Sequence, residues 1–155
     1  MIIVKKATNE DKLKALKLAK DLKDWFSLEG LKHMETDFKF NQVVVAKDQV
    51  GKVVGFLCYT AYSGRVLLLW MGVKLENQGQ GIGSLLLNWL SNETKKLDYY
   101  AIEVETLPEE IKYAPYEKTR DFYYRHGFKR IAYRKASLPG WDDQIVLEKR
   151  VRDIF

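Results

Sequence analysis

The alternation of apolar and polar positions divides the chain into short strands and amphipathic helices. Apolar runs at residues 43–46, 53–61 and 65–73 are separated by turns that contain Gly51 and Ser63–Gly64. Runs of this length between glycine turns are typical of strands that follow one another in an antiparallel meander. We therefore predict three consecutive strands in the first half of the chain.

Helical periodicity precedes and follows this meander. After the capping residues Thr8–Asp11, a helix is expected with Leu13, Leu16, Leu18 and Leu22 as its apolar residues. Trp25–Phe26 and residues 28–34 predict a second, short helix. A strand is expected at residues 2–6. Behind the meander, apolar residues return at helical spacing from Ile82 to Leu97, which predicts a third helix.

The C-terminal part of the chain alternates strands with one more helix. We expect a strand over residues 99–106, a helix over 117–126 and an antiparallel pair at 128–133 and 144–149. Gly127 can close the preceding helix as a C-cap. This order of strands and helices is typical of an α/β fold.

Length and composition favour one domain, residues 1–155, in the cytoplasm. A chain of 155 residues with 46% apolar residues can bury one core. The single cysteine, Cys58, excludes an internal disulfide and fits a reducing compartment. No apolar run is long enough to span a bilayer, and residues 1–6 have the pattern of a strand rather than of a signal peptide.

The charge pattern argues only weakly for anionic partners. The net charge is +5 with 30% charged residues, and the basic pairs are typical of solvated helix and strand faces. There is no long basic run and no interleaving of aromatic and basic residues. A nucleic acid or a membrane is therefore not the expected partner, whereas a homodimer is compatible with the sequence.

A glycine-rich turn follows the last strand of the meander and opens the third helix. Residues 78–83 read Gln-Gly-Gln-Gly-Ile-Gly. A helix N-terminus offers amide donors and the positive end of the helix dipole, and glycines let phosphate oxygens approach the backbone. The turn therefore predicts a pyrophosphate-binding site.

Other glycine-rich turns fit the sequence less well. A Walker A loop needs a lysine that is missing at Gly83–Ser84. A Rossmann turn follows the first strand of its domain and has an acidic residue about twenty positions later, whereas here the next strand opens with Tyr99–Tyr100. A tight turn without a ligand is the remaining alternative, and the density of glycines disfavours it.

Two motifs together resemble the GCN5-related N-acetyltransferase (GNAT) family. Gln78, Gly81 and Gly83 occupy the fixed positions of its acetyl-CoA signature, Gln/Arg-x-x-Gly-x-Gly/Ala. Residues 122–128 are similar to the Phe-Tyr-x-x-x-Gly-Phe that ends the family's last helix. The resemblance, from about Val43 to Phe128, implies the GNAT fold: a mixed, mostly antiparallel sheet of about six to seven strands, flanked by helices and splayed at the acetyl-CoA site.

The resemblance also implies acetyl-CoA as cosubstrate, without a metal. In the family, main-chain groups at the end of the strand before the turn bind the thioester carbonyl and the pantetheine arm, and preorganised backbone donors suit this task. Thr119 stands near the position where many relatives hold the pantetheine with an asparagine. The cofactor-binding residues implied are Met71, Gly72, Val73, Gln78, Gly79, Gln80, Gly81, Ile82, Gly83, Ser84, Thr119 and Tyr123.

Amine acetylation needs a base and an acid. An ammonium with a pKa of about 10.4 must lose a proton near pH 7, and the departing thiolate must be protonated. The resemblance assigns the acid to Tyr123, although a core aromatic residue is the alternative that helix position alone would favour. Tyr124 points elsewhere on the helix and serves as the control position.

The general base is less well defined, because the family's glutamate on the strand before the turn is missing. Glu103 and Glu105 project from one face of the following strand, and either could act through a water. The alternative is that both are strand carboxylates paired with nearby lysines. Cys58 fits a buried small hydrophobe better than a nucleophile, and His126 a favourable charge at a helix C-terminus.

The resulting hypothesis is an N-acetyltransferase that transfers the acetyl group directly to a primary amine of a small molecule or protein, in a ternary complex. Acidic residues in two segments would favour a cationic acceptor: Glu29, Glu35, Asp37, Asp142 and Asp143. A catalytically silent acetyl-CoA-binding sensor or interaction module is the alternative, which the missing strand glutamate favours slightly.

Overall fold

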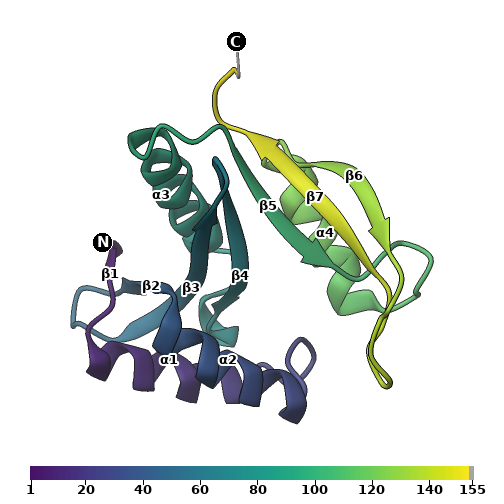
Figure 1. Cartoon of the computed structure of the whole chain (residues 1–155). Coiled ribbons are helices and arrows are strands. Elements are labelled where there is room, and N and C mark those ends of the chain that lie inside the picture. Colours follow the sequence, from purple (N-terminus) through teal and green to yellow (C-terminus); the bar gives the residue numbers. More distant parts are fainter. Residues whose placement is uncertain (154–155) are drawn as a thin grey trace. The chain divides into compact units, whose positions relative to one another are not determined.

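A computed structural model describes residues 1–153 of the chain, and its strands form a seven-stranded sheet in the order β1-β2-β3-β4-β5-β7-β6 (Figure 1). The expected α/β fold with a mixed sheet flanked by helices is thereby confirmed. The chain folds into two compact units. Unit 1 comprises residues 1–60 and 68–93, and unit 2 comprises residues 61–67 and the chain from residue 94 onward.

Unit 1 contains most of the predicted meander and three of the helices. The elements that lie wholly or mostly in it are β1 (Ile3–Lys6), α1 (Asn9–Lys20), α2 (Leu28–Phe40), β2 (Gln42–Lys47), β3 (Val53–Tyr62), β4 (Arg65–Val73), the 3₁₀ turn η1 (Leu75–Asn77) and α3 (Ile82–Lys96). β2 pairs antiparallel with both β1 and β3. Ser63 and Gly64, which join β3 to β4, both have positive φ, as a two-residue hairpin requires.

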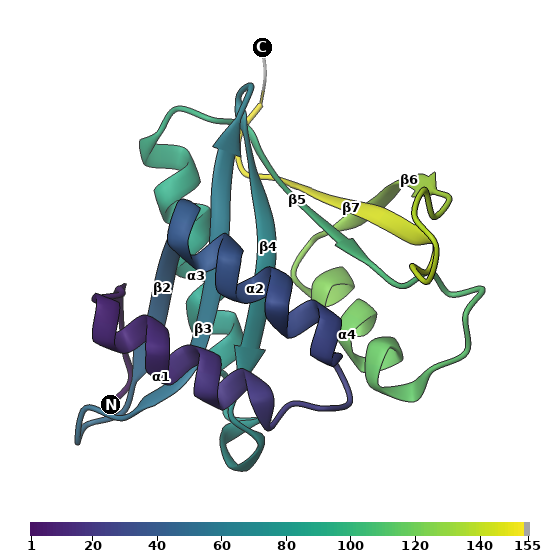
Figure 2. The ribbon, with the colours of Figure 1, turned by 60° about the horizontal axis from the view of Figure 1, so that its bottom comes forward.

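Helices α1 and α2 lie side by side over β2 and β3 (Figure 2). The predicted cap is present, because Thr8 and Asp11 exchange side-chain and backbone hydrogen bonds of 3.0 and 3.1 Å. Leu13, expected on the buried face of α1, is instead 69% exposed. α2 runs to Phe40, six residues beyond the predicted end, and Trp25 and Phe26 lie outside it.

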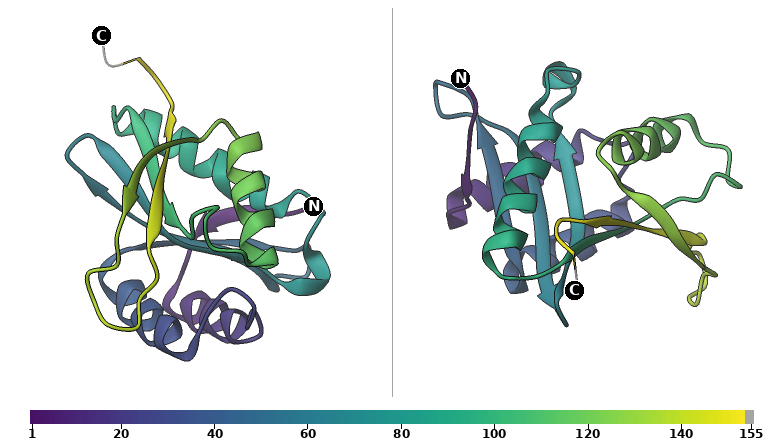
Figure 3. Two further views of the ribbon diagram at one scale, coloured as in Figure 1. Left: turned by 90° about the vertical axis from the view of Figure 1, so that its right-hand side faces the viewer. Right: turned by 90° about the horizontal axis from the view of Figure 1, so that it is seen from above.

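Helix α3 packs on the other face of these strands (Figure 3). Successive residues of β3 point to opposite faces, so Phe56 joins the core under α1 and α2 while Gly55 faces α3. A Cβ on Gly55 would lie only 3.1 Å from Ile82 and 3.2 Å from Leu86. Glycine at this position therefore lets the first turns of α3 approach the sheet closely.

Unit 2 contains the C-terminal strands and one helix. Its elements are β5 (Ala101–Thr106), α4 (Ala114–Arg125), β6 (Lys129–Arg134) and β7 (Gln144–Arg150), with β7 antiparallel to both β5 and β6. α4 begins three residues before the predicted start, with Pro115 in its first turn. Gly127 has a φ of 90° and closes α4 as predicted.

No helix in residues 1–153 is long and apolar enough to cross a membrane.

Candidate functional site

The turn between β4 and α3 has the backbone conformation that its glycines predict. Gly79 and Gly81 have φ values of 79° and 83°, a region that side chains with a Cβ rarely adopt. A Cβ on either residue would meet no other atom within 4 Å. The backbone conformation, and not crowding by the protein, therefore requires these glycines, and the surface of the turn is open.

The turn is anchored at both ends. The side chain of Gln78 donates from Nε2 to the carbonyl of Val73, 3.1 Å away, which ties the turn to the end of β4. At the other end, the Leu85 amide donates to the Gly81 carbonyl at 3.1 Å and begins the hydrogen bonding of α3. The first turn of a helix presents amide donors beyond its own hydrogen bonds, together with the positive end of the dipole. This geometry is suited to an anion.

The last residues of β4 are held by the strand and helices beside them. Met71, Gly72 and Val73 are all half-buried, and the next amide, that of Lys74, donates to Val54 of β3 at 2.9 Å. A Cβ on Gly72 would lie 2.8 Å from the ring of Phe56. The glycine is therefore required by packing.

Tyr123, the candidate general acid, lies inside unit 2. It is 5% exposed, and its ring packs 5.5 Å from that of Phe122 and 5.2 Å from that of Phe128. Burial, with a smaller effect of Tyr116, raises the pKa of the Tyr123 phenol far above its usual value. A phenol keeps its proton at neutral pH even at its ordinary pKa of about 10, and burial here disfavours the phenolate that proton donation would leave.

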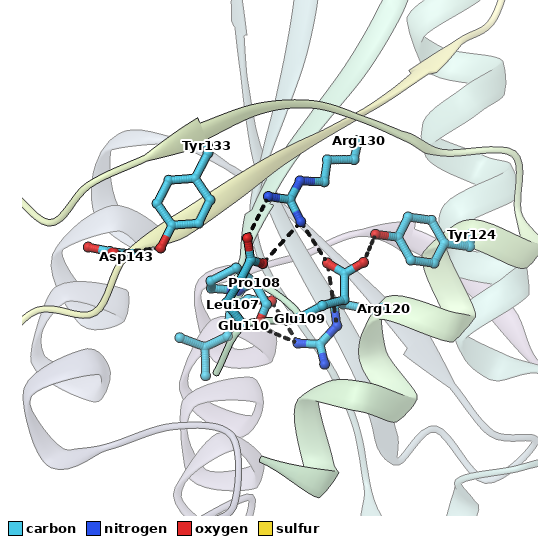
Figure 4. A network of polar contacts seen from close by, with 9 residues as sticks. All are labelled: Leu107, Pro108, Glu109, Glu110, Arg120, Tyr124, Arg130, Tyr133 and Asp143. Carbon is cyan, nitrogen blue, oxygen red and sulfur yellow. Dashed lines mark hydrogen bonds and ion pairs between the residues drawn. The ribbon is translucent and has the colours of Figure 1, made fainter. Parts of the chain in front are cut away.

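Tyr124 points to different surroundings. Its hydroxyl donates to the carboxylate of Glu109 at 2.8 Å, and this hydrogen bond is exposed (Figure 4). Burial and this hydrogen bond raise its pKa to about 12.

The two candidate bases are both held by arginines. Glu103 pairs with Arg65 at 2.9 Å and Glu105 with Arg134 at 2.7 Å, and their side chains are 13% and 46% exposed. Their partners are thus arginines, where the alternative interpretation expected lysines. The ion pairs therefore restrict the positions of both carboxylates.

The register of unit 2 separates these carboxylates from α4. Val104 and Arg130 both pair with Leu147, so these three side chains lie on one face of the sheet. Arg130 donates to Glu109, and Tyr124 of α4 donates to the same side chain. The face of the sheet that carries Arg130 is therefore the face on which α4 lies. Glu103 and Glu105 alternate with Val104 and therefore project from the opposite face.

Three further candidates have interactions within the protein. The Thr119 hydroxyl donates to the Pro115 carbonyl one turn earlier, at 3.2 Å. Asp37 accepts a hydrogen bond of 2.7 Å from the indole of Trp70. Asp143 accepts bonds from the Tyr133 hydroxyl at 2.6 Å and the Ala136 amide at 2.8 Å, and these bonds lower its pKa. Asp37 and Asp143 thus help to hold the fold.

Cys58 is fully buried, as predicted for a small apolar side chain. Burial is the main reason that its pKa rises to about 12. No group of three or more His, Cys, Asp or Glu side chains in residues 1–153 could hold a metal ion.

Arg120 is a residue that the sequence patterns did not single out. It is 4% exposed, and its guanidinium donates to the main-chain carbonyls of Leu107, at 2.7 Å, and Pro108, at 3.3 Å (Figure 4). An arginine on an amphipathic helix is normally exposed to solvent. The sequence pattern therefore does not indicate that Arg120 is buried.

Comparison with known proteins assigns these features to one family. The acetyltransferase (GNAT) domain family matches residues 39–130. No protein among the curated sequences matches the chain.

Solved structures share the fold over nearly the whole chain. A GNAT-family protein from Desulfovibrio desulfuricans is 22% identical with a TM-score of 0.85, and the match covers 98% of this chain and 100% of that one. The ribosomal-protein-S18-alanine N-acetyltransferase of Escherichia coli is 17% identical with a TM-score of 0.74, covering 100% and 97%. The PaiA N-acetyltransferase of Thermoplasma acidophilum, in complex with coenzyme A, is 18% identical with a TM-score of 0.72, covering 97% and 99%.

Proposed function

The chain belongs to the GNAT acetyltransferase family, and we propose that it transfers an acetyl group from acetyl-CoA directly to a primary amine in a ternary complex. Acetyl-CoA supplies a thioester carbonyl that is activated for attack by the amine. The observation that carries the proposal is the turn between β4 and α3, with its two positive-φ glycines, its open surface and its helix N-terminus.

This turn is the proposed pyrophosphate site. Main-chain amides of residues 78–84 donate to the phosphate oxygens, and the dipole of α3 favours their charge. Main-chain groups of residues 71–73 hydrogen-bond the thioester carbonyl and the pantetheine arm, and Thr119 assists through its hydroxyl. That the T. acidophilum protein was solved with coenzyme A supports the same ligand for this fold.

The proposed proton transfers need one base and one acid. Glu103 or Glu105, through a water, removes a proton from the ammonium, and the amine nitrogen then forms its bond to the carbonyl carbon. The carbon–sulfur bond breaks, and Tyr123 donates its phenolic proton to the departing sulfur. The nitrogen, positively charged after its attack, loses its second proton to solvent. Solvent then returns a proton to the Tyr123 phenolate and takes one from the glutamate, so that one proton is released per cycle.

The proposed acceptor is a primary amine of a small molecule or of a protein. The name of the E. coli structure gives a protein alanine as its acceptor, which supports the second class for a chain of this fold. A panel of polyamines and of short peptides with free N-termini covers both classes.

Binding and turnover test the proposal separately. Calorimetry with acetyl-CoA should detect binding that Gly81→Val abolishes, because the new side chain fits neither the backbone nor an approaching phosphate. Gly51→Val is the matched control, since Gly51 also has a positive φ, 85°, and open space around it, but lies in the turn between β2 and β3. Equal loss of binding in both variants would argue against the assigned turn.

Turnover is followed as release of the coenzyme A thiol with each amine of the panel. Release that depends on one amine class supports the enzyme. Tight acetyl-CoA binding without release for any amine would instead favour the silent module, for which the absence of an acidic residue between Arg65 and Val73 is the specific argument.

A further inference from the structure

A buried arginine joins the helix of the candidate acid to the loop that follows β5. Arg120 lies three residues before Tyr123 on α4, and its guanidinium donates to the Leu107 and Pro108 carbonyls at 2.7 and 3.3 Å. These two residues directly follow the last residue of β5, Thr106. Because seven residues separate the end of β5, at Thr106, from the start of α4, at Ala114, this contact ties the helix to the strand more directly than the chain does.

The same loop is held from outside by a network of charged side chains (Figure 4). Arg130 of β6 donates to Glu109 at 3.3 Å and to Glu110 at 3.1 and 3.2 Å. Tyr124 donates to the other carboxylate oxygen of Glu109, and Arg120 Nε lies 3.9 Å from Glu109. α4 and β6 thus hold residues 107–110 together.

The members of this network differ in burial. The Arg120 side chain is 4% exposed, whereas those of Arg130, Glu109 and Glu110 are 34%, 47% and 56% exposed. Hydrogen bonds from a guanidinium to carbonyls are strong and directional. Removing the donor takes this partner from the half-buried Leu107, whereas the Pro108 carbonyl still accepts from the Ile111 amide at 3.0 Å. The exposed ion pairs contribute little. The inner contact of Arg120 therefore determines how α4 is held against the end of β5.

We propose that Arg120 is a positioning residue, which fixes α4 on the loop after β5 and thereby sets where the Tyr123 hydroxyl lies. A charge this deeply buried, with hydrogen bonds to neutral carbonyls and only a distant, half-exposed carboxylate as its ion-pair partner, is expensive to keep for packing alone, because an apolar side chain of similar volume would avoid the desolvation. Its three-residue spacing from Tyr123 puts both side chains on neighbouring positions of one helix face. This inference rests on the acid role proposed for Tyr123.

The experiment is a double-mutant cycle of Arg120→Lys and Tyr123→Phe, with a panel amine as acceptor. Lysine keeps the charge but replaces the planar guanidinium, whose Nη1 donates to both carbonyls, with an ammonium that lacks this fixed geometry. Arg120→Lys alone should lower kcat by roughly 10- to 100-fold, because a displaced catalytic group reacts less readily, and should leave acetyl-CoA affinity unchanged. In the Tyr123→Phe background, where no hydroxyl remains to be positioned, Arg120→Lys should lower kcat by less than about twofold.

Arg130→Lys is the matched control, because it changes the other arginine on Glu109 at the exposed side of the network. Its kcat should equal that of the wild type. Arg120→Gln, which can still donate through its amide, replaces Arg120→Lys if circular dichroism shows that the lysine variant does not fold, and the same non-additivity is expected.

The outcomes separate this inference from the proposed function. Equal losses of kcat for Arg120→Lys in both backgrounds, or wild-type kcat for Arg120→Lys, overturn the positioning role and leave the acid role of Tyr123 standing. Wild-type kcat for Tyr123→Phe removes the acid role itself, and with it the inference that depends on it. A loss of acetyl-CoA affinity equal to the loss of kcat would show that Arg120 serves binding, which also overturns the positioning role.

Discussion

At the residue scale, two adjacent tyrosines of α4 occupy different environments. The Tyr123 ring is enclosed by Phe122 and Phe128, whereas the Tyr124 hydroxyl binds an exposed carboxylate, that of Glu109. Both side chains have the same chemistry, so a difference between their phenylalanine variants reports on position. This makes the pair an internal test of the acid role.

Tyr123→Phe should lower kcat by about 10²- to 10⁴-fold, because it removes the proton donor and keeps the ring. Folding and acetyl-CoA affinity should be preserved. Steady-state turnover measures the first effect, and thermal unfolding and calorimetry measure the others. Tyr124→Phe should keep wild-type turnover and lose only about 0.5–1.5 kcal/mol of stability with its hydrogen bond. Equal turnover in both variants would make Tyr123 a core residue.

The two glutamates of β5 can be separated in the same way. Glu103→Gln and Glu105→Gln each remove the proton acceptor and keep the size of the side chain, so the variant of the true base should lose about 10²- to 10⁴-fold in kcat near pH 7. The other variant should retain wild-type kcat. We expect this loss to shrink as the pH rises toward the pKa of the amine, because solvent then deprotonates more of it. If both variants keep full activity, the base lies elsewhere.

At the element scale, glycines determine how closely the elements of unit 1 approach one another. Gly55 admits the first turns of α3 to the sheet, and Gly72 lies against the ring of Phe56 and the side chain of Leu22. Gly30, within α2, has looser contacts of 3.3 Å or more. A methyl group would therefore be most crowded at Gly72 and least crowded at Gly30.

Gly72→Ala should destabilise the protein by about 1–3 kcal/mol, because its Cβ would force Phe56 and Leu22 to move. Gly30→Ala should change the stability by less than about 1 kcal/mol, because alanine is the better helix former but its Cβ would lie 3.3 Å from the Ser27 hydroxyl that caps α2. Urea unfolding of both variants measures the difference. Similar stabilities for the two would show that the core under β4 adapts to the added methyl group.

The sequence predicted these elements where their patterns were local. β4 and the positive-φ turn residues Gly79 and Gly81 follow from an apolar run and from glycine chemistry, and the structure has both as expected. The extent of α2 was missed, because the polar run over residues 35–37 has the composition of a loop, although Met34 and Phe38 on either side of it recur at helical spacing. Leu13 was misassigned since helical spacing alone does not say which face of α1 meets the sheet.

The site shows the same limit. The glycine signature locates the turn, because backbone conformation restricts the residue type there. The buried contact of Arg120 could not be predicted, since its partners are the main-chain carbonyls of residues 107 and 108. Every residue has such a carbonyl, so the pattern of side chains does not identify these two. The arginine partners of Glu103 and Glu105 depend on strand order, which brings Arg65 and Arg134 to them.

At the scale of the whole molecule, buried tyrosines link stability to alkaline pH. Tyr59 is 3% exposed, and burial, with a smaller effect of Glu93, raises its pKa to about 12. A raised pKa in the folded state means that the folded protein favours the protonated phenol. The resulting stability is complete below the unfolded pKa, about 10, and is lost as the pH rises through the folded value.

The unfolding free energy should therefore fall above about pH 10, by up to about 1.4 kcal/mol per pH unit for each such tyrosine. Tyr59→Phe should flatten this fall, because a phenylalanine has no proton to lose. Tyr62→Phe, at a position of β3 that is 62% exposed, is the control and should leave the slope unchanged. Urea unfolding at intervals between neutral and alkaline pH measures the slopes, and parallel curves for the two variants would contradict the assignment.

The burial of Cys58 has a practical consequence for measuring the reaction. The proposed product is a free thiol, and the protein's one cysteine is fully buried, with a pKa near 12 that leaves almost no reactive thiolate at assay pH. A thiol-reactive dye should therefore count coenzyme A molecules without background from the folded protein. For the same reason, a single cysteine introduced into the β4–α3 turn could be labelled without first removing Cys58. The label would then report on that turn alone.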